Sequence, residues 1–196
     1  VLRQKPLTVA PGTTEAAVAH IASVVARVRL LNSQHKDGLR RLDALTNEIA
    51  ARQAEPGQAC EQRDVGVLRS LPGIGRIVLA TLLAEASQPL AERNYHALRA
   101  LSGVAPVTRN SGKRSGKRSV VVMRNACSMR LRHAVYHWAR VATVRDPKSR
   151  AAYATLRARG HTHGRALRTV GDRLLLVACA MLRDGTEFDP SRRLAV

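Results

Sequence analysis

A run of basic and hydroxyl-bearing residues near the middle of the chain has the composition needed for chemistry on a phosphate. Residues 108–118 read TRNSGKRSGKR, so three hydroxyls stand among five cations in a glycine-rich segment. A serine in such a loop could attack a phosphodiester while arginine and lysine neutralise the charge on phosphorus. The resulting serine ester would keep the energy of the broken bond, so rejoining would need no nucleotide cofactor. The alternative is a flexible phosphate-binding loop without chemistry, and no His, Asp or Glu lies nearby in sequence to act as a base.

A second candidate for phosphate binding is the pentapeptide LPGIG at residues 71–75. Two glycines one residue apart permit a tight turn in which successive backbone N–H groups point outward at a helix N-terminus. Such donors, helped by the helix dipole, bind phosphate without reading sequence. This is the pattern of a helix-hairpin-helix. The alternative is a turn between two helices with no ligand.

Metal binding is not indicated by the remaining polar residues. His133 and His137 are four apart on one expected helix, and His161 and His163 lie in a loop, but no carboxylate or cysteine completes a set. The three cysteines form no CxxC pair, which argues against a zinc module and a disulfide frame. We therefore expect no metal or other cofactor in this segment, and a reducing, cytoplasmic environment.

The charge distribution points to a polyanionic partner. The 196 residues carry 33 Lys and Arg against 14 Asp and Glu, a net charge of +19. No acid occurs between Arg93 and Arg145, where 12 cations do. Such a field attracts nucleic acid. The longest apolar run, residues 174–182, is too short to span a bilayer, so no membrane association is expected.

The elements that must position these residues are mainly α-helical. Residues 15–52 carry a heptad seam of Val18, Ile21, Val25, Val28, Asn32, His35, Leu39, Leu42, Thr46 and Ile49. This pattern predicts a coiled coil, and the alternative is an amphipathic helix packed on its own domain. Further helices are expected up to Ser70, after Gly75, after Asn94, from about 124 to 145, from Asp146-Pro147 to Gly160, and from about 164 to 183. Residues 103–119 are expected to form a loop, with one short strand at 120–122, and the low aromatic content of 3% predicts an aliphatic core.

Several of these motifs follow one another in the order found in one known family. They are Leu71–Gly75, Thr81–Glu85, Gly103–Pro106, Ser111–Lys113, Arg130–Arg132 and Arg157–Gly160. This ordered set resembles the C-terminal domain of the insertion sequence 110 family of transposases, over roughly residues 67–190. The domains expected are a lead-in at 1–14, a coiled-coil helix and linker at 15–66, the C-terminal transposase domain at 67–190 and a tail at 191–196.

The resemblance implies a role in bacterial DNA transposition and recombination. Members of the family join an acidic, RuvC-like metal-binding domain to a coiled coil and a serine-bearing domain, and a structured RNA guides them to DNA. The family serine follows the Ala-Pro element by five residues, which makes Ser111 the expected nucleophile, with Ser115 as second choice. The residues expected to contact DNA or RNA are Gly73, Ile74, Gly75, Arg76, Arg109, Lys113, Arg114, Lys117, Arg118, Arg124, Arg130 and Arg132.

Two departures from the family pattern qualify this expectation. Leu79 stands where the family hairpin has a small residue, and no acidic tetrad can be assembled. The chain begins at Val1 rather than Met, so we expect a fragment that lacks the acidic domain and its divalent metal, such as Mg²⁺, and that is inactive alone. We also expect a homo-oligomer, dimer or tetramer, formed through the coiled coil. The alternatives are a non-catalytic helix-hairpin-helix module that binds nucleic acid and a basic RNA-binding scaffold of the ribosomal kind.

Overall fold

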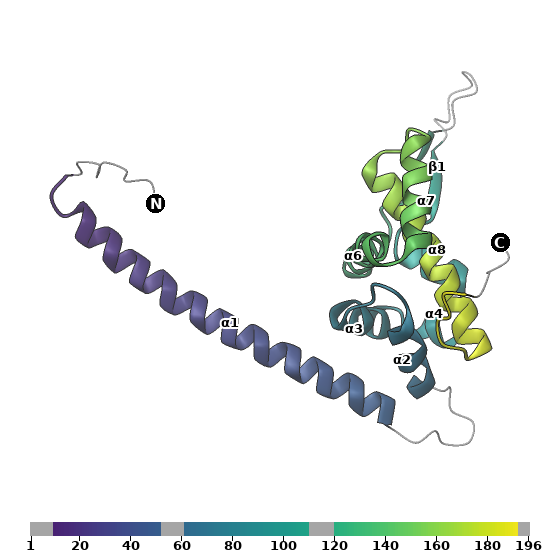
Figure 1. Ribbon diagram of the computed structural model, residues 1–196, viewed down its shortest axis with the longest axis horizontal. Helices are drawn as coiled ribbons and strands as arrows, with labels where there is room; N and C mark the ends of the chain where they lie inside the picture. Colours follow the sequence, from purple (N-terminus) through teal and green to yellow (C-terminus); the bar gives the residue numbers. More distant parts are fainter. Residues whose placement is uncertain (1–9, 52–60, 110–119, 192–196) are drawn as a thin grey trace. The chain divides into compact units, whose positions relative to one another are not determined.

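The computed structural model describes residues 10–51, 61–109 and 120–191 of the chain (Figure 1). The chain divides into two units, Val1–Arg41 and Leu42–Val196. The mainly α fold class is confirmed. In chain order the described elements are α1 (Thr13–Ala51), α2 (Glu61–Ser70), α3 (Arg76–Glu85), α4 (Ser87–Ala91), α5 (Tyr95–Leu101), β1 (Pro106–Arg109), β2 (Val120–Met123), α6 (Met129–Arg145), α7 (Pro147–Ala158) and α8 (His163–Asp184).

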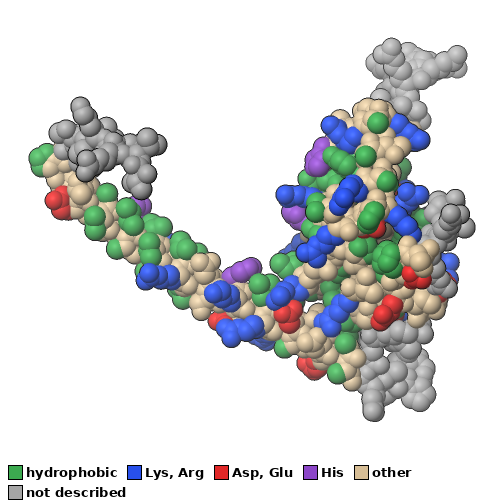
Figure 2. Space-filling model, viewed as in Figure 1, with side chains coloured by type: hydrophobic (Ala, Val, Ile, Leu, Met, Phe, Trp, Pro, Cys, Tyr) green, Lys and Arg blue, Asp and Glu red, His purple; other side chains and the backbone are tan. Residues whose placement is uncertain are grey.

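The heptad seam of α1 is exposed to solvent at its start and packed against the core at its end. In the first unit the apolar side chains are exposed, with 61% of Val18 and 59% of Ile21 accessible to solvent, and hydrophobic side chains run along the helix in Figure 2. In the second unit Thr46 is buried and accepts a hydrogen bond from Arg69 Nη2 at 3.1 Å, and Ile49 packs against the core. Packing on its own domain therefore describes the end of α1, and coiled-coil pairing stays a prediction for the rest.

The helix boundaries of the compact unit follow local capping chemistry. Asn94 caps α5 by accepting from the Ala97 amide. Asp146 caps α7 ahead of Pro147, a residue that the first helical position tolerates. Both boundaries were predicted from the sequence. Helix α6 begins at Met129, later than the expected start near residue 124, because Ser128 accepts from the Leu131 amide and fixes the first turn there.

The expected loop over residues 103–119 is wrong at residues 106–109, which form β1. This strand pairs with β2 in an antiparallel hairpin whose register runs from Pro106↔Met123 to Arg109↔Val120. The strand was missed because four residues are too few for a clear period-two pattern, and because the partner strand supplies the stabilising hydrogen bonds. Residues 110–119 connect the two strands and lie outside the described residues.

The core of the second unit lies between α6, α8 and the helices α2, α3 and α5. Its buried side chains are almost all aliphatic, as predicted, and include Leu68, Leu82, Leu98, Leu131, Leu167 and Leu175. Trp138 is fully buried in α6, and its indole N–H donates to the Pro72 carbonyl at 2.9 Å. No helix that the structure describes is long and apolar enough to cross a membrane.

Two half-buried arginines are neutralised by carboxylates. Arg93 donates through both Nη atoms to Asp64, at 2.6 and 2.7 Å. Arg99 pairs with Asp172 at 2.6 Å, and the Tyr95 hydroxyl donates to the same carboxylate at 2.8 Å, which ties α5 to α8. Burial, followed by the hydrogen bond to Asp172, raises the pKa of Tyr95 to about 12.

Candidate nucleic-acid interface

The turn at residues 71–75 joins α2 to α3, where the sequence predicts a helix-hairpin-helix. Gly73 has a φ of +84°, and a Cβ on it would lie 2.8 Å from the Ala142 amide nitrogen of α6. Ile74 is half-buried against the core. Gly73 is therefore required for packing of the turn on α6. The prediction that the turn also binds phosphate is left open.

The outer side of the same turn is accessible. Gly75 caps α3 with an extended backbone, and no atom would meet a Cβ placed on it within 4 Å. Arg76 is exposed but pairs with Asp43 of α1 at 2.6 Å. A nucleic acid that recruits Arg76 would have to compete with this carboxylate.

The catalytic candidates belong to the connection of the β-hairpin. Arg109 is the last residue of β1. Ser111 and Ser115 lie in residues 110–119, outside the described residues, as do Lys113, Arg114, Lys117 and Arg118. The described part of the hairpin therefore fixes the two points, Arg109 and Val120, from which this basic segment leaves and to which it returns.

Three predicted phosphate contacts gather where the hairpin meets α6. Arg130 is 84% exposed and donates to Glu85 at 3.2 Å, and the same carboxylate accepts from the Ser128 hydroxyl at 2.9 Å. Arg124 Nε donates to the Ala126 carbonyl at 3.0 Å, and the Arg124 carbonyl accepts from Arg132 Nη2. We call Arg124, Arg130 and Arg132 the hairpin-foot arginines.

The two predicted contact regions lie at opposite ends of α3. The turn leads into Arg76, the first residue of this ten-residue helix, while Glu85, its last residue, contacts Ser128 and Arg130. A helix of this length spans about 15 Å. The structure therefore brings Arg124 into contact with Arg132, places Arg130 beside Glu85 at the start of α6, and keeps the turn a helix length away.

One basic residue near the hairpin foot escaped the sequence analysis. Arg168 of α8 donates to the Met123 sulfur of β2 at 3.1 Å. Burial, and then the positive charges of Arg132 and Arg165, lower the pKa of Arg168. Sequence alone gave no sign of it, because α8 carries several basic residues and only the fold decides which of them faces the hairpin.

The histidines do not assemble a metal site. His133 and His137 are exposed on α6, and His163 instead contacts two tyrosines, Tyr153 at 2.8 Å and Tyr136 at 3.5 Å. In the part of the chain that the structure describes, no group of three His, Cys, Asp or Glu side chains could hold a metal ion.

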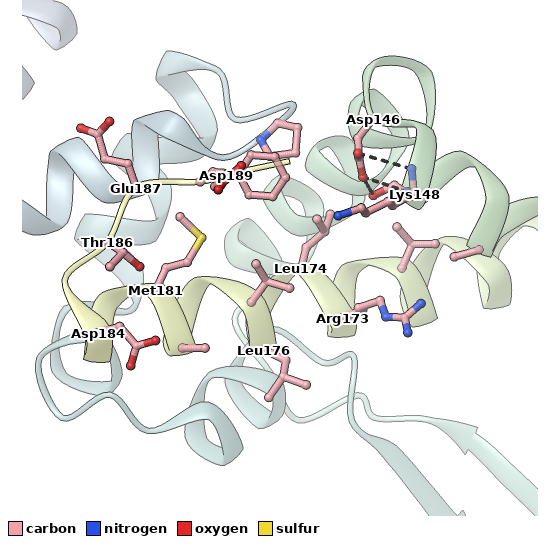
Figure 3. Close-up of a pocket in the computed structure, with 17 residues that line it drawn as sticks. Asp146, Lys148, Arg173, Leu174, Leu176, Met181, Asp184, Thr186, Glu187 and Asp189 are labelled. Atoms are coloured by element: carbon pink, nitrogen blue, oxygen red, sulfur yellow. Dashed lines mark hydrogen bonds between the residues drawn. The ribbon is translucent and has the colours of Figure 1, made fainter. Parts of the chain in front are cut away.

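A large pocket of the second unit is unsuited to a phosphate. It measures about 730 Å³ and lies between α7, α8 and the segment that follows α8 (Figure 3). Its lining is mostly apolar, but Asp146, Asp184, Glu187 and Asp189 contribute carboxylates, and the Asp146 carboxylate accepts from the Ser149 amide and hydroxyl. Lys148 and Arg173 also line the pocket, but the four acids outnumber these two cations and disfavour an anion, so the candidate interface lies elsewhere.

The second unit is thus a basic, helical domain that carries a short β-hairpin with a cation-rich connection. On the face seen in Figure 2, Lys and Arg side chains are spread over this unit. The sequence model of the Transposase IS116/IS110/IS902 family matches residues 65–154, which span the turn, the hairpin and α6. This domain therefore belongs to the IS116/IS110/IS902 family of transposases.

Individual relatives extend the match. An uncharacterized 42 kDa protein of insertion element IS900 from Mycobacterium paratuberculosis is 34% identical over 134 residues, 68% of this chain and 33% of its own length. An uncharacterized 43.6 kDa protein of IS110 from Streptomyces coelicolor is 33% identical over 131 residues, 63% of this chain and 30% of its own length. An uncharacterized 44.8 kDa protein of IS116 from Streptomyces clavuligerus is 33% identical over 125 residues, 64% of this chain and 31% of its own length. The chain spans about a third of the length of these curated relatives.

Proposed function

We propose that this chain is the DNA-handling and strand-transferring part of a bacterial transposase, and that Ser111 is its nucleophile. The observation that carries the proposal is the placement of the Ser-Gly-Lys-Arg segment. It forms the connection of a hairpin anchored on a basic helical domain, inside the region that matches the transposase family. A connection held at both ends by paired strands can present a hydroxyl to a bound DNA strand while the platform stays fixed.

The chemistry would be a transesterification at phosphorus. The Ser111 oxygen would attack a backbone phosphodiester and lose its proton to a base supplied from outside residues 108–118, and the bond to the leaving deoxyribose oxygen would break as that oxygen takes up a proton. Arg109, Lys113 and Arg114 would neutralise charge on the five-coordinate phosphorus. The DNA hydroxyl of a second strand could then attack the phosphoserine and release the serine without net loss of phosphodiester bonds.

The remaining partners are proposed on the family resemblance. A structured guide RNA would select the DNA, and an acidic RuvC-like domain would hold a divalent metal such as Mg²⁺. The exposed apolar seam of α1, which includes Val18, Ile21 and Val28, supports pairing with a second copy. On this proposal the chain needs the acidic domain for DNA cleavage.

A non-catalytic nucleic-acid-binding module is the second candidate. The accessible Gly75 at the start of α3 favours it, because helix-terminal amides can bind phosphate in the absence of any nucleophile. Such a module would need neither Ser111 nor Ser115. The two candidates therefore differ in whether a serine hydroxyl is required.

The test is strand exchange by a complete transposase that contains this domain, with Ser111→Ala and Ser115→Ala as a matched pair. We expect Ser111→Ala to abolish strand exchange and to leave DNA affinity within about twofold, because one neutral hydroxyl contributes little to binding. We expect Ser115→Ala to remain active. Recombination by the Ser111→Ala protein would refute the nucleophile and favour the binding module.

A further inference from the structure

A small cavity at the foot of the β-hairpin carries two arginines and no acid. It measures about 180 Å³ and is lined by the end of α5 and the residues after it, by Met123 of β2, and by parts of α6 and α8. Arg132, Arg168 and His133 line it, and no carboxylate of the described residues does. The volume is below the 300–1,000 Å³ or so typical of sites for small organic ligands, but it suits a single phosphate group.

The guanidinium groups at this cavity have unused hydrogen-bond capacity. Arg132 Nη2 donates to the Arg124 carbonyl, and Nη1 meets the Met129 sulfur at 3.6 Å, while Arg132 Nε is buried without a partner among the residues that the structure describes. Arg168 Nη1 donates to the Met123 sulfur, at 3.1 Å. A thioether is a weak acceptor. Both groups therefore keep strong donors for an anion.

Elsewhere in the same domain the fold compensates half-buried arginines with acids. Arg93 has Asp64 and Arg99 has Asp172. Arg132 and Arg168 are instead like charges at one cavity, and the pKa of Arg168 is lowered first by burial and then by the positive charges of Arg132 and Arg165. Two like charges that are partly withdrawn from water are unfavourable unless an anion completes the site.

The backbone leaves room for this arrangement. Gly103 has a φ of +71°, and a Cβ at that position would lie 2.9 Å from Arg132 Nη2 and 3.0 Å from Arg132 Nε. Only glycine both accepts this conformation and leaves the space that the guanidinium occupies. The glycine thus leaves the space beside it to the Arg132 guanidinium and to the Cys127 sulfur, which would lie 2.9 Å from the same Cβ.

We propose that Arg132 and Arg168 together bind one backbone phosphate of a DNA strand at the hairpin foot. This inference rests on the proposed function and extends it to a specific contact. The cavity adjoins Met123, which pairs with Pro106, whereas the basic connection leaves the hairpin at Arg109, three residues along β1. Three residues of strand span about 10 Å. The bound phosphate would therefore be held apart from the point where the basic connection begins, and would position the strand.

The direct test uses the full chain and a single-stranded DNA 12-mer, with affinity measured by fluorescence anisotropy over a range of salt concentrations. We expect Arg168→Gln to weaken binding about tenfold, as expected for a lost charge-assisted contact. The slope of log K against log salt should fall by about 0.7, the value for one phosphate contact on a single strand. The matched control is Arg173→Gln, which removes the same charge from an exposed position of α8 that lines the larger pocket, and which should change affinity less than twofold.

A methylphosphonate scan of the 12-mer identifies the phosphate. At one position of the DNA, the neutral linkage should itself weaken binding, and Arg168→Gln should then cause no further loss of affinity. At every other position the losses of affinity from the linkage and from Arg168→Gln should add. Full competition by millimolar inorganic phosphate, or an Arg168-dependent preference for an RNA 12-mer, would overturn the assignment to a DNA backbone. Equal effects of Arg168→Gln and Arg173→Gln would overturn the site itself.

Two further measurements distinguish this phosphate site from a purely structural role of Arg168 and from the proposed role of Ser111. Because Arg168 opposes Arg132, Arg168→Gln should leave the free energy of unfolding unchanged or raise it, whereas an arginine needed only for folding would lower it. Ser111→Ala should leave the Arg168-dependent binding intact. If Ser111 forms the DNA adduct but no Arg168-dependent phosphate contact is found, this inference alone is refuted. If the Arg168-dependent contact is found but Ser111 is not required for strand exchange, the proposed nucleophile alone is refuted.

Discussion

Replacing Gly73 with alanine tests whether the turn between α2 and α3 is a packing element. The new Cβ would lie 2.8 Å from the Ala142 nitrogen and 3.1 Å from the Ala142 Cα, both backbone atoms of α6 that cannot rotate away. The substitution would also place a non-glycine residue at a φ of +84°.

The two costs can be summed from these observations. A left-handed backbone costs an alanine about 1–2 kcal/mol relative to glycine, and overpacking against a fixed neighbour costs about 1–3 kcal/mol. We therefore expect Gly73→Ala to lower the free energy of unfolding by about 2–5 kcal/mol. The α2–α3 turn would have to move away from α6, and the hydrogen bond from Trp138 to the Pro72 carbonyl would lengthen.

The assay is urea unfolding followed by far-UV circular dichroism and by Trp138 fluorescence, with Gly66→Ala as the control. Gly66 lies inside α2 with no atom within 4 Å of the position of an added Cβ, so this change should raise the free energy of unfolding by about 0.5–1 kcal/mol. A Gly73→Ala protein as stable as the parent would refute the reasoning. It would mean that the turn does not dock on α6 as described.

Three further predictions test other parts of the structure. Asp64→Asn should lower the free energy of unfolding by about 3 kcal/mol, because it leaves the half-buried Arg93 without its carboxylate, whereas Arg40→Gln, which breaks an exposed pair with Asp37, should cost less than about 1 kcal/mol in the same urea titration. Stability should fall as pH rises from 10 to 12, because the pKa of Tyr95 is about 12 in the folded chain against 10.0 normally, so the unfolded chain ionises first; a Tyr95→Phe protein with an equally steep decline would contradict this. In a Cys60→Ser background, iodoacetamide should modify the half-buried Cys127 before Cys179. Cys179 is 1% exposed, and burial raises its pKa to about 11. Peptide mass spectrometry that shows the reverse order would contradict the burial of Cys179 in the core.

The proposed pairing of α1 has its own measurement. The exposed seam predicts that the chain self-associates, and that Ile21→Glu combined with Val28→Glu returns it to a monomer by placing charges in the seam. Sedimentation equilibrium compares the two proteins. Ala16→Glu with Ser23→Glu, which places the same charges on the exposed side of the same helix opposite the heptad seam, is the control. Equal effects of both pairs would refute a specific seam.

Local signals let the sequence predict most helices of this chain. Caps such as Asn94 and Asp146-Pro147 act within one turn of helix, while the apolar periodicity of α6 and the apolar run of α8 mark buried residues. The β1 strand was not predictable in this way, because its stability comes from a partner strand beyond a ten-residue connection. The end of α1 was predicted as seam, but Thr46 and Ile49 belong to the second unit and pack inside it, a contact set by tertiary structure.

The candidate site likewise has parts that the sequence predicted and parts that only the tertiary structure shows. The basic connection at 110–119 and the turn at 71–75 were visible as motifs because their residues are neighbours in sequence. The pairing of Arg132 with Arg168 was not visible, since 35 positions separate them and only the packing of α6 and α8 brings both to one cavity. The structural role of Gly73 was hidden for the same reason, because it depends on Ala142.

The central claim is that the Ser111 oxygen becomes bonded to DNA phosphorus. The most direct measurement is mass spectrometry of a complete transposase with this domain, trapped on a DNA substrate whose nicked strand dissociates after attack and prevents rejoining. The account predicts a nucleotide adduct on the peptide that contains Ser111, absent from the Ser111→Ala protein and present in Ser115→Ala. An adduct on another residue, or efficient strand exchange with no covalent protein–DNA species at any time, would contradict it.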